Sequence, residues 1–383
     1  MSPSGNLTSV ELRQLIQAVF APTAGDSSLI LLIDVPNAAV PDNEGWQKRR
    51  AIAVEWLNML RTEQRHLGLQ TVDLFFYENV ESNNADLPAH CYKYDGSPQS
   101  VSIDELSCSA KRLELPSLLA QTDIVLAPTE FSATAPLKLL AKQYGFRAAT
   151  LPGFSRRMIP ALRLDYRKVH QRVMVFKKKL DDASGIDVVL QARREEYASH
   201  FDIRFSTAHA SSGLIRERGT AGNLPSGEAY IVPNEGQEEE SRTEGMLPVQ
   251  FGDEVVVFKV RKNRAVEVLT AGPQSATQRR LLDDEPSYGN IAEVGIGVLG
   301  EFGVTAVGSA LLDEKLGLHV AFGRSDHFGG ATGPQAFRSP KRVVHIDWVY
   351  VPTLQPAIFV RKVSLLYTDG REEVIMRDGG FEV

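Results

Sequence analysis

The sequence predicts an α/β protein in which a doubly wound N-terminal α/β domain is followed by a β-rich α+β domain. In the first half of the chain, short apolar stretches typical of strands alternate with stretches of helical periodicity. This alternation is expected of a parallel sheet with helices on both faces. After about residue 185, Gly, Pro, Ser and Thr separate short β-rich stretches instead. We therefore expect two domains, residues 1–185 and 186–383.

The expected elements of the first domain follow from this alternation. Residues 28–35 (SLILLIDV) are almost continuously apolar, as expected of a strand buried on both faces. Residues 44–68 have the periodicity of a helix that ends at Gly68. Other strands are expected at residues 71–77, 122–128 and 147–153. Other helices are expected at residues 105–120, 132–145 and 165–183, the last with a basic face that we interpret as solvated.

The expected strands of the second domain are short and lie between turn residues. Representative stretches are VVLQARR, AYIVPN, EVVVFKVR and RVVHIDWVYVP. The segment 234–246 (NEGQEEESRTEGM) is polar and acidic, and we expect it to be an exposed loop.

The composition excludes several classes of protein. The apolar fraction of 43% and the charged fraction of 23% are those of an ordinary soluble domain. A net charge of −6 provides no basic surface for nucleic acid or an anionic membrane. The chain has neither a long apolar stretch nor a recognisable signal peptide, so we expect a cytoplasmic location. Its two cysteines, Cys91 and Cys108, lack the CxxC spacing of a thiolate zinc site.

One glycine pattern resembles a dinucleotide-binding motif. Gly295, Gly297 and Gly300 in VGIGVLG fit G-x-G-x-x-G. That motif requires a preceding buried strand and a βαβ unit, whereas a polar turn precedes these glycines. The pattern therefore does not indicate a dinucleotide site.

A histidine and an aspartate lie two residues apart inside an apolar strand near the end of the chain. His345 and Asp347 in KRVVHIDWVYVP point to the same face, because side chains at i and i+2 of a strand do so. Burying two ionisable groups together is costly without a partner. The face is therefore either hydrated or in contact with a cation.

Three further residues have the chemistry of metal ligands. Glu228 lies between a turn and a strand, Glu293 directly precedes a glycine-rich stretch, and His319 interrupts an apolar strand. Imidazole nitrogens combined with carboxylate oxygens suit zinc, iron, manganese or cobalt. Each residue taken alone is better explained as a hydrogen-bonded polar residue in a strand. All five together favour a metal site.

His327, in the glycine-flanked stretch GRSDHFGG, is the third catalytic candidate beside Glu228 and Glu293. A loop histidine of this kind binds substrate, carries protons or simply faces solvent.

Four stretches of the second domain, taken in order, resemble the metalloaminopeptidases of the aminopeptidase T, S and II type. They are GNLPSGEAYIVPNEG, IAEVGIGV, LLDEKLGLHVAFG and FGG followed by VVHIDWVY. The resemblance implies a thermophilic-metalloprotease-like hydrolase that cleaves an amide or peptide bond of a small molecule or short peptide with metal-activated water. It implies two divalent metals (zinc, cobalt or manganese) and a homodimer formed by the β-rich domains. It places the metal ligands at Glu228, Glu293, His319, His345 and Asp347.

The chain departs from that family at one position. The family carries a tyrosine shortly after its HxAxG strand, where this chain has Asp326 and His327. The FGG variant resembles a branch that includes 2,5-dihydroxypyridine dioxygenase, in which two histidines and one carboxylate hold a single Fe(II) for ring cleavage. That branch has a histidine where this chain has Glu293, so the glutamate favours the hydrolase. A non-enzymatic protein with a structural metal is a third interpretation, although structural sites are usually cysteine-rich and closed.

Overall fold

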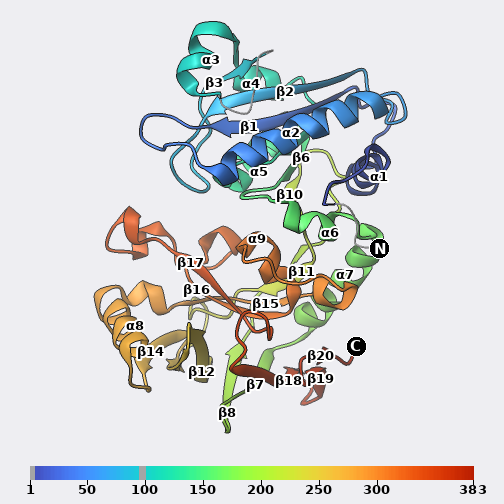
Figure 1. Ribbon diagram of the computed structural model, residues 1–383. Helices are drawn as coiled ribbons and strands as arrows, with labels where there is room; N and C mark the ends of the chain where they lie inside the picture. Colours follow the sequence, from blue (N-terminus) through green and yellow to red (C-terminus); the bar gives the residue numbers. More distant parts are fainter. Residues whose placement is uncertain (1–4, 95–100) are drawn as a thin grey trace. The chain divides into compact units, whose positions relative to one another are not determined.

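The computed structural model describes residues 5–94 and 101–383, which form two compact units. The first unit contains residues 1–170 and 213–226, and the second contains residues 171–212 and 227–383. The chain therefore crosses between units three times, since the segment 213–226 contributes a strand to the first unit. The single division expected after residue 185 lies at the first residues of strand β7 (Gly185–Ala192). Figure 1 traces this order in colour along the chain.

The first unit is built on a seven-stranded sheet with the strand order β10-β6-β5-β1-β2-β3-β4. The first five strands of this order are parallel to their neighbours, and the last two pair antiparallel. Its strands are β1 (Ser28–Val35), β2 (Thr71–Glu78), β3 (His90–Lys93), β4 (Lys111–Glu114), β5 (Ile124–Ala127), β6 (Arg147–Thr150) and β10 (Ala221–Asn223). Its helices are α1 (Ser9–Phe20), α2 (Glu44–Glu63), α3 (Ile103–Ser109), α4 (Leu115–Leu119), α5 (Thr134–Tyr144), the short turn η1 (Arg156–Met158) and α6 (Ile159–Leu162).

Strand β1 lies inside this sheet, between β2 and β5. Seven of its eight residues are buried, which explains why the stretch is apolar on both faces. Helix α2 begins at an N-cap, Asn43, whose side chain accepts a hydrogen bond from the Trp46 backbone N–H. The predicted α/β fold class is confirmed.

The expected helix at residues 105–120 is wrong. The segment contains helix α3, strand β4 and helix α4 in succession. Strand β4 pairs with β3, from His90 with Glu114 to Lys93 with Lys111. This pairing, far along the chain, outweighs the helical periodicity of the segment, and Pro116 lies in the first turn of the helix that restarts after it.

The second unit contains two antiparallel sheets. The larger has the order β14-β13-β12-β8-β7-β18-β19-β20, and the smaller has the order β17-β16-β15-β11-β9. The larger sheet is formed by β7, β8 (Glu195–Asp202), β12 (Glu244–Phe251), β13 (Glu254–Arg261), β14 (Arg264–Val268), β18 (Ile358–Leu366), β19 (Glu372–Arg377) and β20 (Gly380–Phe381). The smaller is formed by β9 (His209–Ser211), β11 (Glu228–Ile231), β15 (Ile291–Gly297), β16 (Leu318–Gly323) and β17 (His345–Val349).

Helices complete this unit. They are α7 (Tyr166–Asp182), which begins in the first unit, α8 (Pro273–Asp284), α9 (Ala310–Asp313) and the short turns η2 (Pro286–Gly289), η3 (Leu299–Phe302), η4 (Glu314–Leu316), η5 (Asp326–Phe328), η6 (Pro334–Ala336) and η7 (Pro340–Arg342).

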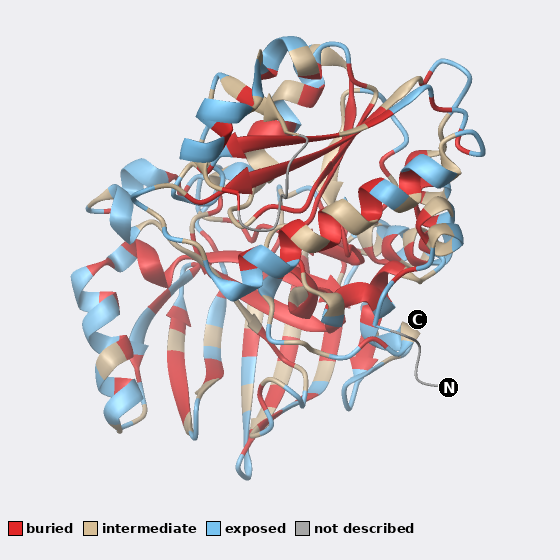
Figure 2. Cartoon of the chain, turned by 45° about the horizontal axis from the view of Figure 1, so that its top comes forward, coloured by how far each residue is buried: buried red, intermediate tan, exposed pale blue. Residues whose placement is uncertain are grey.

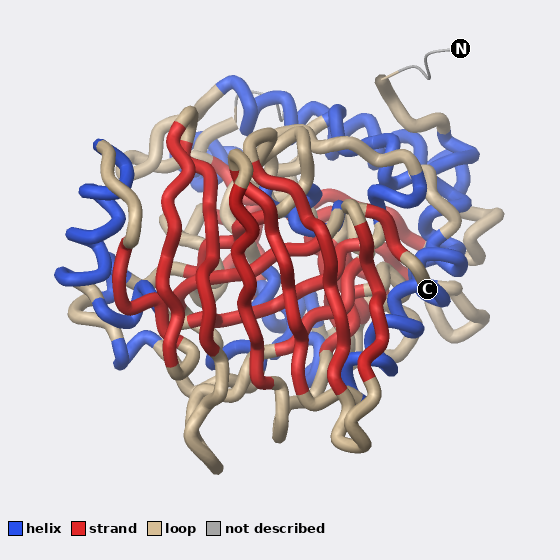
Figure 3. The backbone as a smooth tube through the Cα atoms, turned by 90° about the horizontal axis from the view of Figure 1, so that it is seen from below, coloured by secondary structure: helices blue, strands red, loops and turns tan. Residues whose placement is uncertain are grey.

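Aromatic rings fill the space between the two sheets of the second unit. Phe258 of the larger sheet packs edge-on against Phe322 of the smaller one, with ring centroids 5.2 Å apart. Phe251 packs in the same way against Trp348, at 4.9 Å. Figure 3 shows the strands of the larger sheet in front, with other strands crossing behind them. One face of the smaller sheet therefore packs against the larger sheet and belongs to the hydrophobic core. Its other face does not pack against the larger sheet.

Burial follows these layers. Strands inside the sheets, such as β1, β5 and β11, are buried, edge strands such as β4 and β14 are largely exposed, and the helices expose one side (Figure 2). Strands β15 and β16 are buried along their whole length. Among the described helices, none is long and apolar enough to cross a lipid bilayer.

Candidate metal centre

The five predicted ligands lie on one face of the smaller sheet. Four strands supply them: Glu228 begins β11, Glu293 is in β15, His319 is in β16, and β17 carries the remaining two, His345 and Asp347. Residues paired across neighbouring strands share a face. The relevant pairs are Glu228 with Gly297, Gly295 with His319, Glu293 with Ala321, Ala321 with Asp347, and Gly323 with His345. The structure brings all five together; that they bind metal stays a prediction.

Small residues between the ligands make room for them. A Cβ atom at Gly295 would lie 2.0 Å from Nε2 of His319, far inside van der Waals contact. Ala321 separates Glu293 from Asp347 in the same row. In the stretch VGIGVLG, which resembled a dinucleotide motif, Gly295 instead leaves space for the ring of His319. Gly295 and Gly297 lie inside an antiparallel strand, and not at a strand-to-helix turn.

Both histidines are oriented by main-chain carbonyls. Nδ1 of His319 lies 3.3 Å from the oxygen of Gly317, and Nδ1 of His345 lies 2.8 Å from the oxygen of Arg324. A carbonyl oxygen only accepts, so each Nδ1 carries a hydrogen and donates. The Nε2 atom of each ring then points to the face of the sheet, where it carries a hydrogen while the ring is protonated and offers a lone pair once that proton is lost. This is the arrangement that metal-binding histidines adopt.

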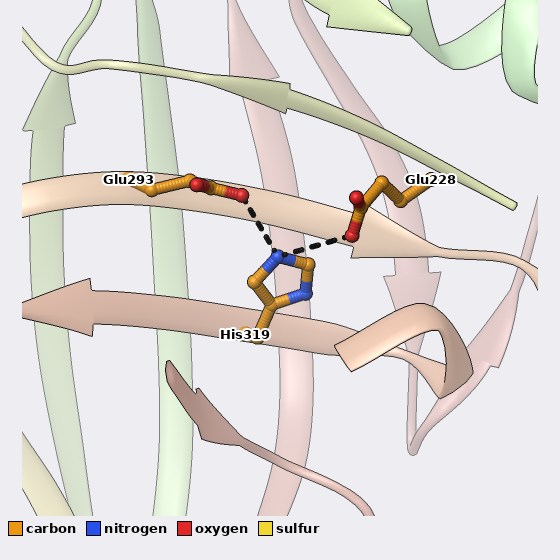
Figure 4. Close-up of side chains that lie close together, drawn as sticks. All are labelled: Glu228, Glu293 and His319. Carbon is orange, nitrogen blue, oxygen red and sulfur yellow. Dashed lines mark hydrogen bonds and ion pairs between the residues drawn. The ribbon is translucent and has the colours of Figure 1, made fainter. Parts of the chain in front are cut away.

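The Nε2 atoms point at carboxylates. Nε2 of His319 is 3.1 Å from Oε1 of Glu293 and 3.7 Å from Oε2 of Glu228 (Figure 4). Nε2 of His345 is 3.5 Å from Oε2 of Glu293 and 3.6 Å from Oδ1 of Asp347. Glu293 thus directs one oxygen to each histidine.

The ligand atoms form two triads that share Glu293. One triad is Glu228, Glu293 and His319, and the other is Glu293, His345 and Asp347, each with its ligand atoms within 4.8 Å of one another. Each triad therefore gathers three ligand atoms of the kind that hold a metal ion, and Glu293 belongs to both.

The electrostatics of the face favour a cation. Burial works against protonated His319, but the carboxylates of Glu293 and Glu228 outweigh it and raise the imidazole pKa to about 9. Burial raises the pKa of Glu293, but its hydrogen bonds to the two histidines outweigh this and hold that pKa below the ordinary value. Oε2 of Glu228 has no hydrogen-bond partner among the described residues. A buried carboxylate oxygen without a hydrogen-bond partner, close to an imidazole nitrogen, fits a metal ion that would take the place of the imidazole proton.

A buried lysine lies against this face. Lys315, in η4, is 1% exposed, and its Nζ donates to Oε1 of Glu228 at 2.7 Å and also to Glu314. Burial raises the pKa of the Glu314 carboxyl to about 8, against the opposing effect of Lys315. Sequence reasoning missed both residues, because a turn before the strand has no periodicity that indicates its orientation.

His327 lies beside the centre in η5. Its ring centroid is 5.2 Å from that of His345 and 3.9 Å from that of Phe328. Burial, together with the charges of His345 and Arg324, lowers the pKa of His327 to about 4. The side chain is 31% exposed, so a molecule at the centre is able to reach it.

A tyrosine and a further histidine also border the centre. Tyr230 lies two residues after Glu228 on the same strand, and therefore on the same face. The ring of His209 stacks on it at 5.2 Å, and Phe328 packs edge-on against it at 4.9 Å. The i, i+2 rule that paired His345 with Asp347 applies equally to Tyr230, which sequence reasoning overlooked.

Replacing Lys315 with methionine is expected to lower the free energy of unfolding by about 3–5 kcal/mol, because it leaves Glu228 buried without its partner. The same change should weaken metal binding, since Glu228 is no longer held in position. Urea unfolding and metal content after dialysis measure both effects. Lys178→Met is the control, because Lys178 pairs with Asp182 on the surface, with a side chain 75% exposed; it should leave the free energy of unfolding nearly unchanged. Equal free energies of unfolding for the two variants would contradict the role of Lys315 as the buried partner of Glu228.

Comparisons with known proteins give structural similarity alone. No protein-family model matches the chain, and no curated protein matches its sequence. The structure is similar to 2,5-dihydroxypyridine dioxygenase from Pseudomonas putida KT2440, with 14% sequence identity and a TM-score of 0.59. It is also similar to AmpT from Thermus thermophilus, with 15% identity and a TM-score of 0.58. Each similarity covers 98% of both chains. The chain therefore shares one fold with both proteins over nearly its full length.

Proposed function

We propose that this protein is a metal-dependent hydrolase that cleaves an amide or peptide bond, with two divalent ions held by Glu228, Glu293, His319, His345 and Asp347. The observation that carries the proposal is the sharing of Glu293 between two triads. Two-metal centres of this kind are typical of hydrolases such as aminopeptidases. The resemblance of the second domain to metalloaminopeptidases and the shared fold with AmpT support it.

The ligand charges suit two dications. Glu228, Glu293 and Asp347 supply three negative charges on one face, and the two imidazoles add neutral nitrogen ligands. When bound, the ions would supply an activated water and polarise the scissile carbonyl.

The protein's own side chains have separate tasks in this proposal. Both oxygens of Glu293 face histidines, so Glu293 holds the centre together. Lys315 holds Oε1 of Glu228, so its Oε2, which has no hydrogen-bond partner in the described part of the chain, is the oxygen that Glu228 offers to an ion. His327, whose ring lies 5.2 Å from that of His345 at the edge of the centre, is the residue proposed to contact the substrate.

A mononuclear Fe(II) dioxygenase acting on a dihydroxylated aromatic ring is the alternative. The shared fold with 2,5-dihydroxypyridine dioxygenase and the FGG stretch favour it. A single Fe(II) is commonly held by two histidines and one carboxylate. His319, His345 and Asp347 satisfy that requirement, but two buried glutamates then have no ligand role. The glutamates therefore favour the hydrolase.

Metal replacement distinguishes the two functions. Apo protein reconstituted with Zn²⁺, Co²⁺, Mn²⁺ or Fe²⁺ is assayed on aminoacyl amides, short peptides, small cyclic amides and dihydroxylated aromatics while oxygen uptake is recorded. We expect hydrolysis with Zn²⁺, which has no redox chemistry, and no oxygen consumption. Two metal ions per chain should accompany full activity.

The control is the His345→Ala variant, which removes a ligand and should be inactive with every metal. Turnover that requires Fe²⁺ and consumes O₂ would overturn the hydrolase and support the alternative.

A further inference from the structure

A carboxylate outside the ligand set gathers hydrogen bonds from three segments of the second unit. Glu235 follows β11, and its Oε1 accepts from Nδ2 of Asn290 at 2.5 Å, Oγ of Ser325 at 2.8 Å and Oγ1 of Thr332 at 2.9 Å. Its Oε2 accepts from the backbone N–H of Ala331 and from the side chain of Gln237. These partners come from the approach to β15, from the loop after β16 and from the turn of Glu235 itself.

The donors around Glu235 are neutral. None of the ion pairs found within residues 5–94 and 101–383 includes it. A carboxylate that accepts this many hydrogen bonds is held firmly, because bonds to an ionised acceptor are stronger than those between neutral groups. An amide in its place would turn one acceptor into a donor and set it against other donors.

The loop fastened in this way, residues 323–333, is tightly closed. The Ser325 backbone N–H donates to the oxygen of Thr332 at 2.9 Å, and the Thr332 N–H returns a bond to Oγ of Ser325 at 3.2 Å. A Cβ atom at Gly330 would lie 2.2 Å from Oγ of Ser325 and 2.7 Å from Oε2 of Glu235. Glycine at this position therefore allows the loop to wrap around the carboxylate.

The same loop carries groups that border the metal centre. The ring of His327 lies against the ring of His345, and the oxygen of Phe328 is 2.8 Å from Nε2 of His209. At the start of the loop, the oxygen of Arg324 receives the Nδ1 hydrogen of His345. Asn290, which donates to Glu235, also donates to the oxygen of Gly323 at 2.9 Å. Both ends of the loop are thus connected to this one carboxylate.

We propose that Glu235 is a positioning residue of the centre, which closes the loop 323–333 and thereby holds His327 where it contacts the substrate. This role rests on the proposed function only for the contribution of His327 to turnover. The closure of the loop by Glu235 is independent of the reaction. It is a role that the resemblance to known families does not assign.

A double-mutant cycle tests the role. Glu235→Gln should lower kcat about 10- to 100-fold, the usual loss when a residue that supports the centre is changed, while two metal ions per chain are retained. The double variant Glu235→Gln, His327→Ala should have the same kcat as His327→Ala alone, because the effects of residues that act through one another are not additive. The proposal would be overturned if the fold-loss of kcat in the double variant equalled the product of the two single losses. Loss of metal in Glu235→Gln alone would also overturn it.

Hydrogen exchange provides a readout that does not need turnover. Backbone exchange in a peptide covering residues 323–333 should be faster in Glu235→Gln and unchanged in Glu240→Gln, a control glutamate 69% exposed and paired with Lys262. Thr332→Val, which removes a single donor to Oε1, should give a smaller change in the same direction. Unchanged exchange in both loop variants would overturn the proposal even in an active enzyme. If the wild type hydrolyses nothing with any metal, the proposed function fails, and the exchange comparison still decides the role of Glu235.

Discussion

Glu293→Gln is expected to abolish the binding of both proposed metal ions. The glutamate directs one oxygen toward each histidine and belongs to both triads. Glutamine keeps the shape but removes the charge and offers a single acceptor oxygen. The loss of turnover should exceed the roughly 10- to 100-fold that follows the loss of a supporting residue. Metal analysis of reconstituted, dialysed protein measures the ions retained per chain.

Two comparisons sharpen this expectation. Glu228→Gln should retain the ion held by the other triad, since Glu293, His345 and Asp347 remain. Glu267→Gln, a change on the surface of β14 where the side chain is 55% exposed, should retain both ions. Two ions in Glu293→Gln would contradict the bridging role, and none in Glu228→Gln would show that the two sites do not fill independently.

Gly295→Ala is expected to abolish metal binding without touching a ligand. The new methyl group would lie 2.0 Å from Nε2 of His319, whose ring is fully buried and bonded to the oxygen of Gly317. The ring has to leave its position, and the overpacking should cost about 1–3 kcal/mol of stability. Metal content and chemical unfolding measure both effects.

A glycine in an open environment is the matched control for this change. Gly222, in β10, would place its Cβ atom 3.6 Å from Cδ1 of Ile215, the nearest atom apart from its chain neighbours, which is ordinary van der Waals contact. Gly222→Ala should therefore keep both the metal and most of the stability. Normal metal content in Gly295→Ala would mean that His319 is not a ligand.

Elements with a strong local sequence pattern were predictable. Residues 28–35 form β1 with the expected bounds, because a strand buried on both faces must be apolar throughout. Residues 105–120 were not, since β4 depends on a partner, β3, that local periodicity does not reveal. The expected helix at 44–68 ends earlier, at Glu63, and the last residues before Gly68 continue as turns.

The candidate site divides in the same way. The two-residue repeat of a strand placed His345 and Asp347 on one face. Glu228, Glu293 and His319 were candidates from their residue type and context, and the resemblance implied that all five are ligands. Lys315 did not follow, since its ammonium meets Glu228 only when a turn before β16 folds over β11. Glu235 did not follow either, because its partners Asn290, Ser325 and Thr332 lie 55 to 97 residues further along the chain. Contacts of that range arise from tertiary structure, which a local pattern does not contain.

The main-chain acceptors of the two histidines make the centre insensitive to one kind of change. Every amino acid has a carbonyl oxygen, so no substitution at position 317 or 324 removes the group that orients either ring. Replacing Arg324 breaks its ion pair with Asp326 but leaves the acceptor of His345 present. A mutational scan of side chains would therefore overlook this support entirely. These carbonyl acceptors are displaced only by a change in the path of the backbone. A substitution at Gly323, whose φ is 107°, is such a change.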